Sequence, residues 1–581
     1  SLIIGHSTTG TLDAATYNTA VGLTALDAIT SGDNNTAVGY GALTANTTGT
    51  INVAVGYNSL YTNTTGSQNV AVGRDSLKLN TTAIANTGIG TSALSAVTTG
   101  GYNTAVGTGA LKTNTTAANN TAVGYEALLV NTTGAELTAV GYQAGTANTT
   151  GTRLTAIGYQ AGLANTTGVE NTFIGRKAGL ANTTGAYNVA VGVEALDANT
   201  TGGSNVAMGV HALGANTTGT YNVAIGAESL KTATTVNENT AVGYYALAVN
   251  TAQRNTGIGY EALQANTTAE YVTAVGFRAL KSNTTGGGNV AVGFVALEDC
   301  TTGYSNTAVG SDAGKEMTTG ASNVAVGYQA LNVNTTGSDN TAVGKNAGAL
   351  ITTGAKNVCI GRHAGDSVTT ADGNTIIGEN AGEGVTTGHS NVIIGQQTGA
   401  YQRSLTTGHT NVLLGNRVYP SAVDVTQEIV IGYNAVGQGQ STFTFGHQSN
   451  DSSITFGETT ITAPSDERLK KDITTSTAGL GFINDLRPVT YKWKNEGDIP
   501  SDLNGYVEGS TEPYKNAFTE HGFVAQEVKT AIDAHTEIKD GFGMWKESPD
   551  GRQRIGDAAL VPMLVKAIQE LSAKVEALEN P

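Results

Sequence analysis

Residues 120–136 read Asn-Thr-Ala-Val-Gly-Tyr-Glu-Ala-Leu-Leu-Val-Asn-Thr-Thr-Gly-Ala-Glu. About two dozen similar units follow one another with a step of 17 residues, and one step is a residue shorter. A fixed internal period of this kind is typical of a repeat protein in which each unit packs against its neighbours. The glycine that closes each Asn-(Thr/Val)-Ala-(Val/Ile)-Gly segment marks the period, at Gly5, Gly22, Gly39, Gly56, Gly73, Gly90, Gly107, Gly124, Gly141, Gly158, Gly175, Gly192, Gly209, Gly226, Gly243, Gly259, Gly276 and onward to Gly395.

Each unit contains one short β segment and two turns. We number its positions from the opening asparagine, so that Asn120 is at position one and Glu136 at position seventeen. Alternation along the β segment predicts that the β-branched residues at positions two and four point into a narrow core. The alanine at position three would then lie on a tightly packed face that a second chain approaches. The glycine at position five permits a sharp bend, and Asn-Thr-Thr-Gly at positions twelve to fifteen forms a turn.

The sequence therefore predicts a mostly β protein, with a parallel β-solenoid or β-roll shaft of 17-residue repeats. Two glycines and several β-branched residues in every unit exclude a helix. One coil this small buries little apolar surface, so we expect three copies to associate about the long axis as a homotrimer. The Asn-x-Ala-Val-Gly units resemble the head repeats of trimeric autotransporter adhesins, which build a left-handed parallel β-roll from three chains. The repeats of that family are shorter than 17 residues.

Composition and charge exclude several functions. The 581 residues include 77 glycines, 13% charged residues and a net charge of −16, which argues against a nucleic-acid partner. A stretch of about 18 apolar residues is absent, so membrane insertion is not expected. The histidines are scattered without metal-ligand spacing, so we expect no metal and no cofactor. Cys359 stands where other repeats carry alanine, and we interpret it as a small apolar residue. The frequent Asn-Thr-Thr sequence formally matches glycosylation sequons, but we interpret it as a turn element.

Three segments are expected along the chain: the repeat shaft at 1–395, a neck or slimmer β-stalk at 396–464, and a C-terminal α+β domain at 465–581. After Gly395 the period decays. Six of the eight prolines and both tryptophans, Trp493 and Trp545, follow Pro464. The opening residues Ser-Leu-Ile-Ile-Gly-His read as the middle of a repeat, so we expect a missing N-terminal region.

Four blocks of the last segment resemble the intramolecular chaperone autoprocessing domain of phage endosialidases and tail fibres. They are Ser465–Ile473, Leu486–Trp493, His521–Val528 and Leu560–Leu571, in that order. The resemblance implies a domain that trimerises, guides the folding of the β structure before it and then cuts itself off at its opening Ser-Asp. It also implies a Ser-Lys dyad in which Ser465 is the nucleophile and Lys470 the general base, with the cleavage site at Ser465 and Asp466.

The residues are chemically suited to this role, but a simpler interpretation stays open. A serine hydroxyl needs a base within about 3 Å, and a lysine serves as that base only when burial or nearby cations favour its uncharged form. Five residues on an α-helix turn through about 140°, so the segment around Ser465 must be extended or looped. Alternatively, Ser-Asp caps a helix that starts near Glu467 and the lysines are solvated. Lys471 is a weaker candidate for the base, and we interpret His521 as structural.

These features predict a trimeric phage tail fibre or virion appendage that attaches to a host-cell receptor or glycan. The chain would act as a single-turnover serine autopeptidase on itself and be located in the virion. Its missing N-terminal region would contact other virion tail proteins. Leu564, Ile568, Leu571, Val575 and Leu578 form a short heptad seam that favours a coiled coil. Two alternatives stay open: a trimeric adhesin on a bacterial surface, and a glycan-cleaving tailspike. The acids available to a tailspike are thinly spread, as at Asp27, Asp75, Asp197 and Asp312.

Overall fold

The computed structural model describes residues 2–4, 15–400, 403–448, 451–458, 461–462, 465, 467–503, 505–540, 542–548 and 551–580. The chain separates into two compact units, Ser1–Pro464 and Ser465–Pro581. The first is a stack of β coils and the second a small α+β unit, which confirms the predicted fold class. The assignment of 396–464 as a separate neck stays a prediction.

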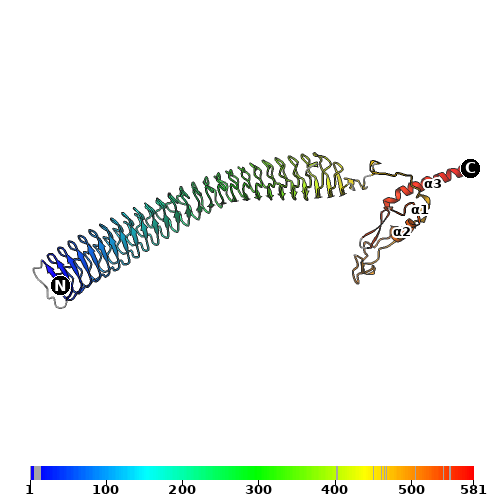
Figure 1. Cartoon of the computed structure of the whole chain (residues 1–581). Coiled ribbons are helices and arrows are strands. Elements are labelled where there is room, and N and C mark those ends of the chain that lie inside the picture. Colours follow the sequence, from blue (N-terminus) through cyan, green and yellow to red (C-terminus); the bar gives the residue numbers. More distant parts are fainter. Residues whose placement is uncertain are drawn as a thin grey trace. The chain divides into compact units, whose positions relative to one another are not determined.

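In the first unit every repeat contributes one three-residue strand, followed by turns that close the coil (Figure 1). The strands are β1 (Leu2–Ile4), β2 (Thr19–Val21), β3 (Thr36–Val38), β4 (Val53–Val55), β5 (Val70–Val72), β6 (Thr87–Ile89), β7 (Thr104–Val106), β8 (Thr121–Val123), β9 (Thr138–Val140), β10 (Thr155–Ile157), β11 (Thr172–Ile174), β12 (Val189–Val191), β13 (Val206–Met208), β14 (Val223–Ile225), β15 (Thr240–Val242), β16 (Thr256–Ile258), β17 (Thr273–Val275), β18 (Val290–Val292), β19 (Thr307–Val309), β20 (Val324–Val326), β21 (Thr341–Val343), β22 (Val358–Ile360), β23 (Thr375–Ile377) and β24 (Val392–Ile394).

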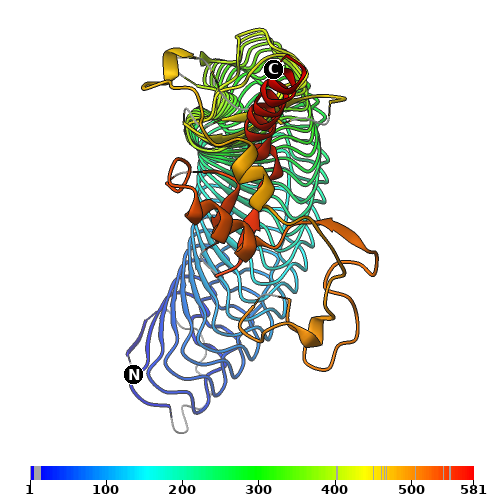
Figure 2. The ribbon, with the colours of Figure 1, turned by 90° about the vertical axis from the view of Figure 1, so that its right-hand side faces the viewer.

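Neighbouring strands are parallel and pair position by position. In β8 and β9, for example, Thr121 pairs with Thr138 and Val123 with Val140. Equivalent positions of successive repeats therefore form rows along the stack, and Figure 2 shows coils that overlie one another. The shorter repeat does not break the register, because β15 still pairs with β16 at the same positions.

Past Ile394 the same sheet continues with longer strands. β25 (Val412–Asn416), β26 (Ile429–Tyr433) and β27 (Thr442–His447) still stack in parallel on β24. The last strand, β28 (Ser452–Thr455), pairs antiparallel with β27. This reversal occupies the edge of β27 with a strand of its own chain, which leaves that edge unavailable for further parallel stacking.

The expectation for the two strand faces is wrong. The alanine at position three, such as Ala122 or Ala139, is fully buried inside its own coil. The residues at positions two and four point outward and are partly exposed; Val140 keeps 37% of its surface. The reason is space, because the inside of a 17-residue coil is already filled by residues of the turn opposite the strand. Where a leucine stands at position nine, the strand residue at position three is alanine or glycine, so that at most a methyl group enters the remaining space.

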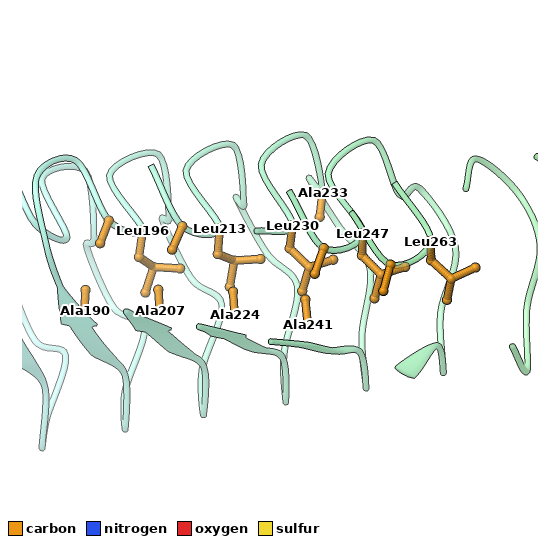
Figure 3. Packing of buried hydrophobic residues seen from close by; sticks show 14 of the residues in the cluster. Ala190, Leu196, Ala207, Leu213, Ala224, Leu230, Ala233, Ala241, Leu247 and Leu263 are labelled. Carbon is orange, nitrogen blue, oxygen red and sulfur yellow. The ribbon is translucent and has the colours of Figure 1, made fainter. Parts of the chain in front are cut away.

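The core consists of the strand alanines and a row of leucines at position nine. Leu196, Leu213, Leu230, Leu247 and Leu263 lie in one row along the stack, from left to right in Figure 3, and the strand alanines point toward them. These leucines adopt a left-handed backbone, as Leu196 does with φ 53°. Some repeats carry glycine at position nine instead, and a larger side chain from a strand or a turn then fills the space; Met317 and Ile351, for example, lie beside Gly314 and Gly348. Phe173, at position three and fully buried, occupies the space beside Gly162 and Gly179.

Two rows of buried asparagines run through the coils and satisfy the polar backbone of the turns. In the position-one row, Asn69 Nδ2 donates to Asn52 Oδ1 at 3.1 Å and to the carbonyl of Ala83 at 2.9 Å. In the position-twelve row, Asn63 Nδ2 donates to Asn46 Oδ1 at 2.8 Å. Because the sequon asparagines of the second row are fully buried, a folded coil does not present them to a glycosyltransferase.

The described residues of the second unit form two small two-stranded antiparallel sheets and three α-helices around a small core. Its core includes Phe482, Val528, Ile532 and Met544. Strand β29 pairs antiparallel with β30, and β31 with β32. The elements are η2 (Glu467–Leu469), α1 (Leu480–Asp485), β29 (Val489–Tyr491), η3 (Glu496–Asp498), β30 (Glu520–Gly522), α2 (Ala525–Ala534), β31 (Trp545–Glu547), β32 (Gln553–Ile555), η4 (Asp557–Leu560) and α3 (Val561–Glu579).

Helix α3, which the sequence predicts as a coiled-coil helix, leaves its apolar seam uncovered in the single chain. Ala567 is its buried residue, whereas the heptad residues are between 43% and 81% exposed, at Leu564, Ile568, Leu571, Val575 and Leu578. In the part of the chain that the structure describes, α3 and the other helices are too short or too polar to cross a membrane.

Candidate active site

The structure brings Ser465 and Lys470 into contact. Lys470 Nζ lies 2.7 Å from Ser465 Oγ, and both side chains are exposed. Ser465 is the first residue of the second unit. The two residues implied by the resemblance are thus at hydrogen-bond distance where the chain passes from the shaft into the second unit.

A single 3₁₀ turn makes this contact possible. η2 covers Glu467–Leu469, and the backbone N–H of Lys470 donates to the carbonyl of Glu467 at 3.0 Å. The turn ends at Lys470, and Ser465 lies outside it, as expected for a pair that cannot share one face of an α-helix. The second residue of the predicted cleavage site, Asp466, lies outside the described residues.

The other candidates of this region lie apart from the pair. Among the described contacts, none joins Lys471 or His521 to Ser465. His521 is in β30, opposite Thr490 in β29, which is consistent with its structural interpretation.

The arrangement supplies two of the parts that a serine nucleophile requires. A hydroxyl within hydrogen-bond distance of an amine can lose its proton to that amine when the amine is uncharged. The serine oxygen can then attack a nearby carbonyl carbon. Because both groups are exposed in the single chain, water competes for the amine, and exclusion of that water would have to come from further contacts.

Exposed ion pairs that the sequence-based prediction lacked join distant segments of the second unit. Arg487 and Glu527 form a two-pronged pair that ties the segment before β29 to α2. The hydrogen bonds from Arg487 lower the pKa of Glu527. Both residues stand within the blocks quoted above, but their sequence separation of forty residues offers no periodic signal.

Helix α1 is fixed from both ends. Glu570 in α3 accepts the backbone N–H of Leu480 at 2.9 Å, and this bond lowers the pKa of the Glu570 carboxyl. At the other end, Asp485 lies 2.8 Å from His535 Nε2, and this hydrogen bond raises the pKa of His535. Helix α1 is therefore connected to α3 through Glu570 and to the C-terminal end of α2 through His535.

The four aspartates considered for a tailspike do not form a glycosidase pair with one another. Asp27, Asp75, Asp197 and Asp312 follow β2, β5, β12 and β19, so at least three coils separate any two of them. At about 4.8 Å per coil this is roughly 14 Å, more than the separation that glycosidase carboxylates require. Burial raises the pKa of Asp197, and its acidic neighbour Glu194 pairs with Arg176 at 2.8 Å.

Within the described residues, three or more His, Cys, Asp or Glu side chains nowhere gather as a metal site would require. Cys300 and Cys359 are buried and unpaired, and burial raises the pKa of each thiol to about 12. Neither cysteine is therefore a reactive nucleophile.

The second unit is a small α+β domain with a serine-lysine pair at its start. Residues 465–537 match the family described as chaperone of endosialidase, which confirms the resemblance in this part of the chain. Neither the curated proteins nor the solved structures gave a match. The chain thus joins a β-solenoid to a C-terminal segment of this chaperone family.

Proposed function

We propose that the chain is the shaft of a trimeric phage tail fibre or virion appendage that contacts the host surface. Its C-terminal unit is an intramolecular chaperone that directs trimer folding and then cuts itself off. The observation that carries the proposal is the 2.7 Å contact between Lys470 Nζ and Ser465 Oγ at the start of the segment that matches the chaperone family.

The uncovered seam of α3 supports assembly through the second unit. Its heptad residues, among them Ile568 at 65% and Leu578 at 81% exposure, are too apolar and too regular to face water. Their 4, 3, 4, 3 spacing suits a bundle of identical helices. Such a bundle holds the C-terminal ends of the copies together. The coils of different copies are then close to one another and associate faster than they would as separate chains.

The cleavage step uses the two side chains in contact. Lys470 in its uncharged form takes the proton of the Ser465 hydroxyl, and Oγ attacks the carbonyl carbon of a peptide bond next to Ser465. The carbon–nitrogen bond breaks, the amine leaves with the proton that Lys470 returns, and an ester remains. Water then hydrolyses the ester and regenerates the hydroxyl, so each chain turns over once.

The exposure of the pair suggests when this step occurs. In the single chain water reaches both side chains. Packing of the copies around the junction would exclude that water and favour the uncharged amine. Cleavage would therefore follow assembly, so that the chaperone stays attached until the shaft has folded.

The test is a set of variants expressed as the full chain and analysed under denaturing conditions. Ser465→Ala should give one uncut species, because the nucleophile is absent. Lys470→Ala should slow cleavage by about 10²-fold or more through loss of the base. Lys471→Ala is the matched control and should be cut like the wild type, into a shaft of about 460 residues and a fragment of about 117, as the position of Ser465 requires.

Efficient cleavage in both Ser465→Ala and Lys470→Ala would refute the dyad. Sedimentation of the same samples shows whether each variant still assembles, so that a folding defect is not mistaken for lost chemistry. Peptide mapping of the wild-type fragments identifies the bond beside Ser465 that breaks.

A further inference from the structure

The outward face of the shaft sheet forms one continuous uncharged strip. It consists of the side chains at positions two and four of β2 to β24, which are Thr or Val at position two and Val, Ile or Met at position four. Val140, Met208 and Ile258 expose 37%, 41% and 37% of their surface in the single chain. Isolated apolar side chains on a surface need no explanation, but a strip that runs past more than twenty coils does.

The residue types found at positions two and four in different repeats differ from those found at position seventeen, which is another surface position. Position seventeen is also outward, and it carries Tyr102, Glu136, Arg153, Ser204 or Gly288 in different repeats. Over the same repeats positions two and four never carry a charged or amide side chain. If both surfaces faced water, both should tolerate charged and amide side chains, so the strip has a constraint that position seventeen lacks.

We infer that this strip is the surface by which the shafts of the trimer pack on one another, in parallel and in register. The inference rests on the trimer of the proposed function and assigns its interface. The occupant is a second copy because the strip repeats once per coil, at about 4.8 Å, and the matching strip of another copy repeats with the same spacing. A parallel arrangement follows when the C-terminal units hold the same ends of the copies together.

This assignment corrects the sequence-based expectation without abandoning the trimer. The alanine rows belong to the core of each coil, and the β-branched rows belong to the contact between coils of different chains. Rigid Val, Ile and Thr side chains lose little rotamer freedom on burial, which favours a flat interface of this kind.

Thiol labelling of the assembled full-length protein tests the assignment. Val140→Cys places a thiol in the strip, and Val249→Cys places one outside it, at position eleven. The two valines expose 37% and 40% in the single chain, so they form a matched pair. Cys300 and Cys359 are buried, so the reagent should not label them in the folded protein. In the trimer, a maleimide should label Val140→Cys at least ten times more slowly than Val249→Cys, and equally fast after denaturation.

Other outcomes overturn the assignment in distinguishable ways. Equal labelling in a particle of three chains would reject the strip as the interface and leave the proposed trimer intact. A single chain per particle, by sedimentation, would reject the trimer itself. Protection that appears only in intact virions, and not in the purified fibre, would show that a different protein covers the strip.

Discussion

At the residue scale, the glycine that closes each strand lies directly against the same glycine of the next coil. Gly56 has φ +137°, and a Cβ added there would lie 2.5 Å from the carbonyl oxygen of Gly73. The backbone conformation is one that side-chain-bearing residues rarely adopt, and the neighbouring backbone cannot move without moving the coil. Glycine is therefore required at this position for two reasons: the backbone has a positive φ, and the neighbouring coil leaves no space for a Cβ atom.

Gly56→Ala should destabilise the shaft by more than the roughly 1–3 kcal/mol of backbone strain alone. Gly439→Ala is the matched control, because Gly439 has φ +129° but no atom within 4 Å of the added Cβ. Thermal unfolding of both variants separates the two contributions. Equal losses of stability would show that stacking of the glycines adds nothing to the strain.

The candidate site was partly predictable at this scale. The residues Ser465 and Lys470 came from a resemblance, and their sequence spacing excluded one α-helical face. The 3₁₀ turn that brings them to 2.7 Å could not be derived, because a three-residue turn has no periodic pattern. The pairs Arg487–Glu527 and Asp485–His535 were also missed, since each joins distant segments through side chains whose partners no spacing rule identifies.

At the scale of the element, the coil keeps its core full by exchanging large and small residues between the strand and the facing turn. Most repeats combine a strand alanine with a leucine at position nine. Where Gly162 and Gly179 replace that leucine, Phe173 replaces the alanine and occupies the space between them. Close packing of this kind makes each coil sensitive to a change in volume.

Phe173→Ala should therefore destabilise the shaft by about 3–5 kcal/mol, because the two neighbouring glycines leave a cavity that no side chain can fill. Tyr187→Ala removes a ring of similar size from an exposed position and should change stability by less than about 0.5 kcal/mol. Limited proteolysis around coils 154–188, compared between the two variants, measures the difference. Similar protease resistance in both would contradict the proposed role of Phe173.

The repeat length, the position of each strand and the parallel stacking were predictable from the sequence, because they follow from the period of 17 and the glycine spacing. The direction in which each strand faces was not. Alternation shows that positions two and four share a face and position three the other, but it does not say which face is inside. That depends on the space left by the leucine and asparagine rows, as at Leu196 and Asn199, which only the folded coil reveals.

At the scale of the whole molecule, the chain combines a shaft of nearly identical coils with a C-terminal segment that matches a chaperone family. Repeats that are nearly identical can pair out of register by one full coil with little loss of contacts. Joining the copies at one end before the coils form would select the correct register. Under the proposed function, cleavage removes that guide, and the assembled fibre would then persist because of its unfolding barrier rather than by equilibrium refolding.

The central claim is that the mature particle contains three copies of a shaft, each cut from its chaperone beside Ser465. Native mass spectrometry of the purified wild-type protein, followed by denaturing mass spectrometry of the same sample, tests it most directly. The account predicts a particle with three shaft chains, and on denaturation a shaft fragment whose end lies beside Ser465. A folded particle that yields the unbroken chain of 581 residues, or one built from a single copy, would contradict it.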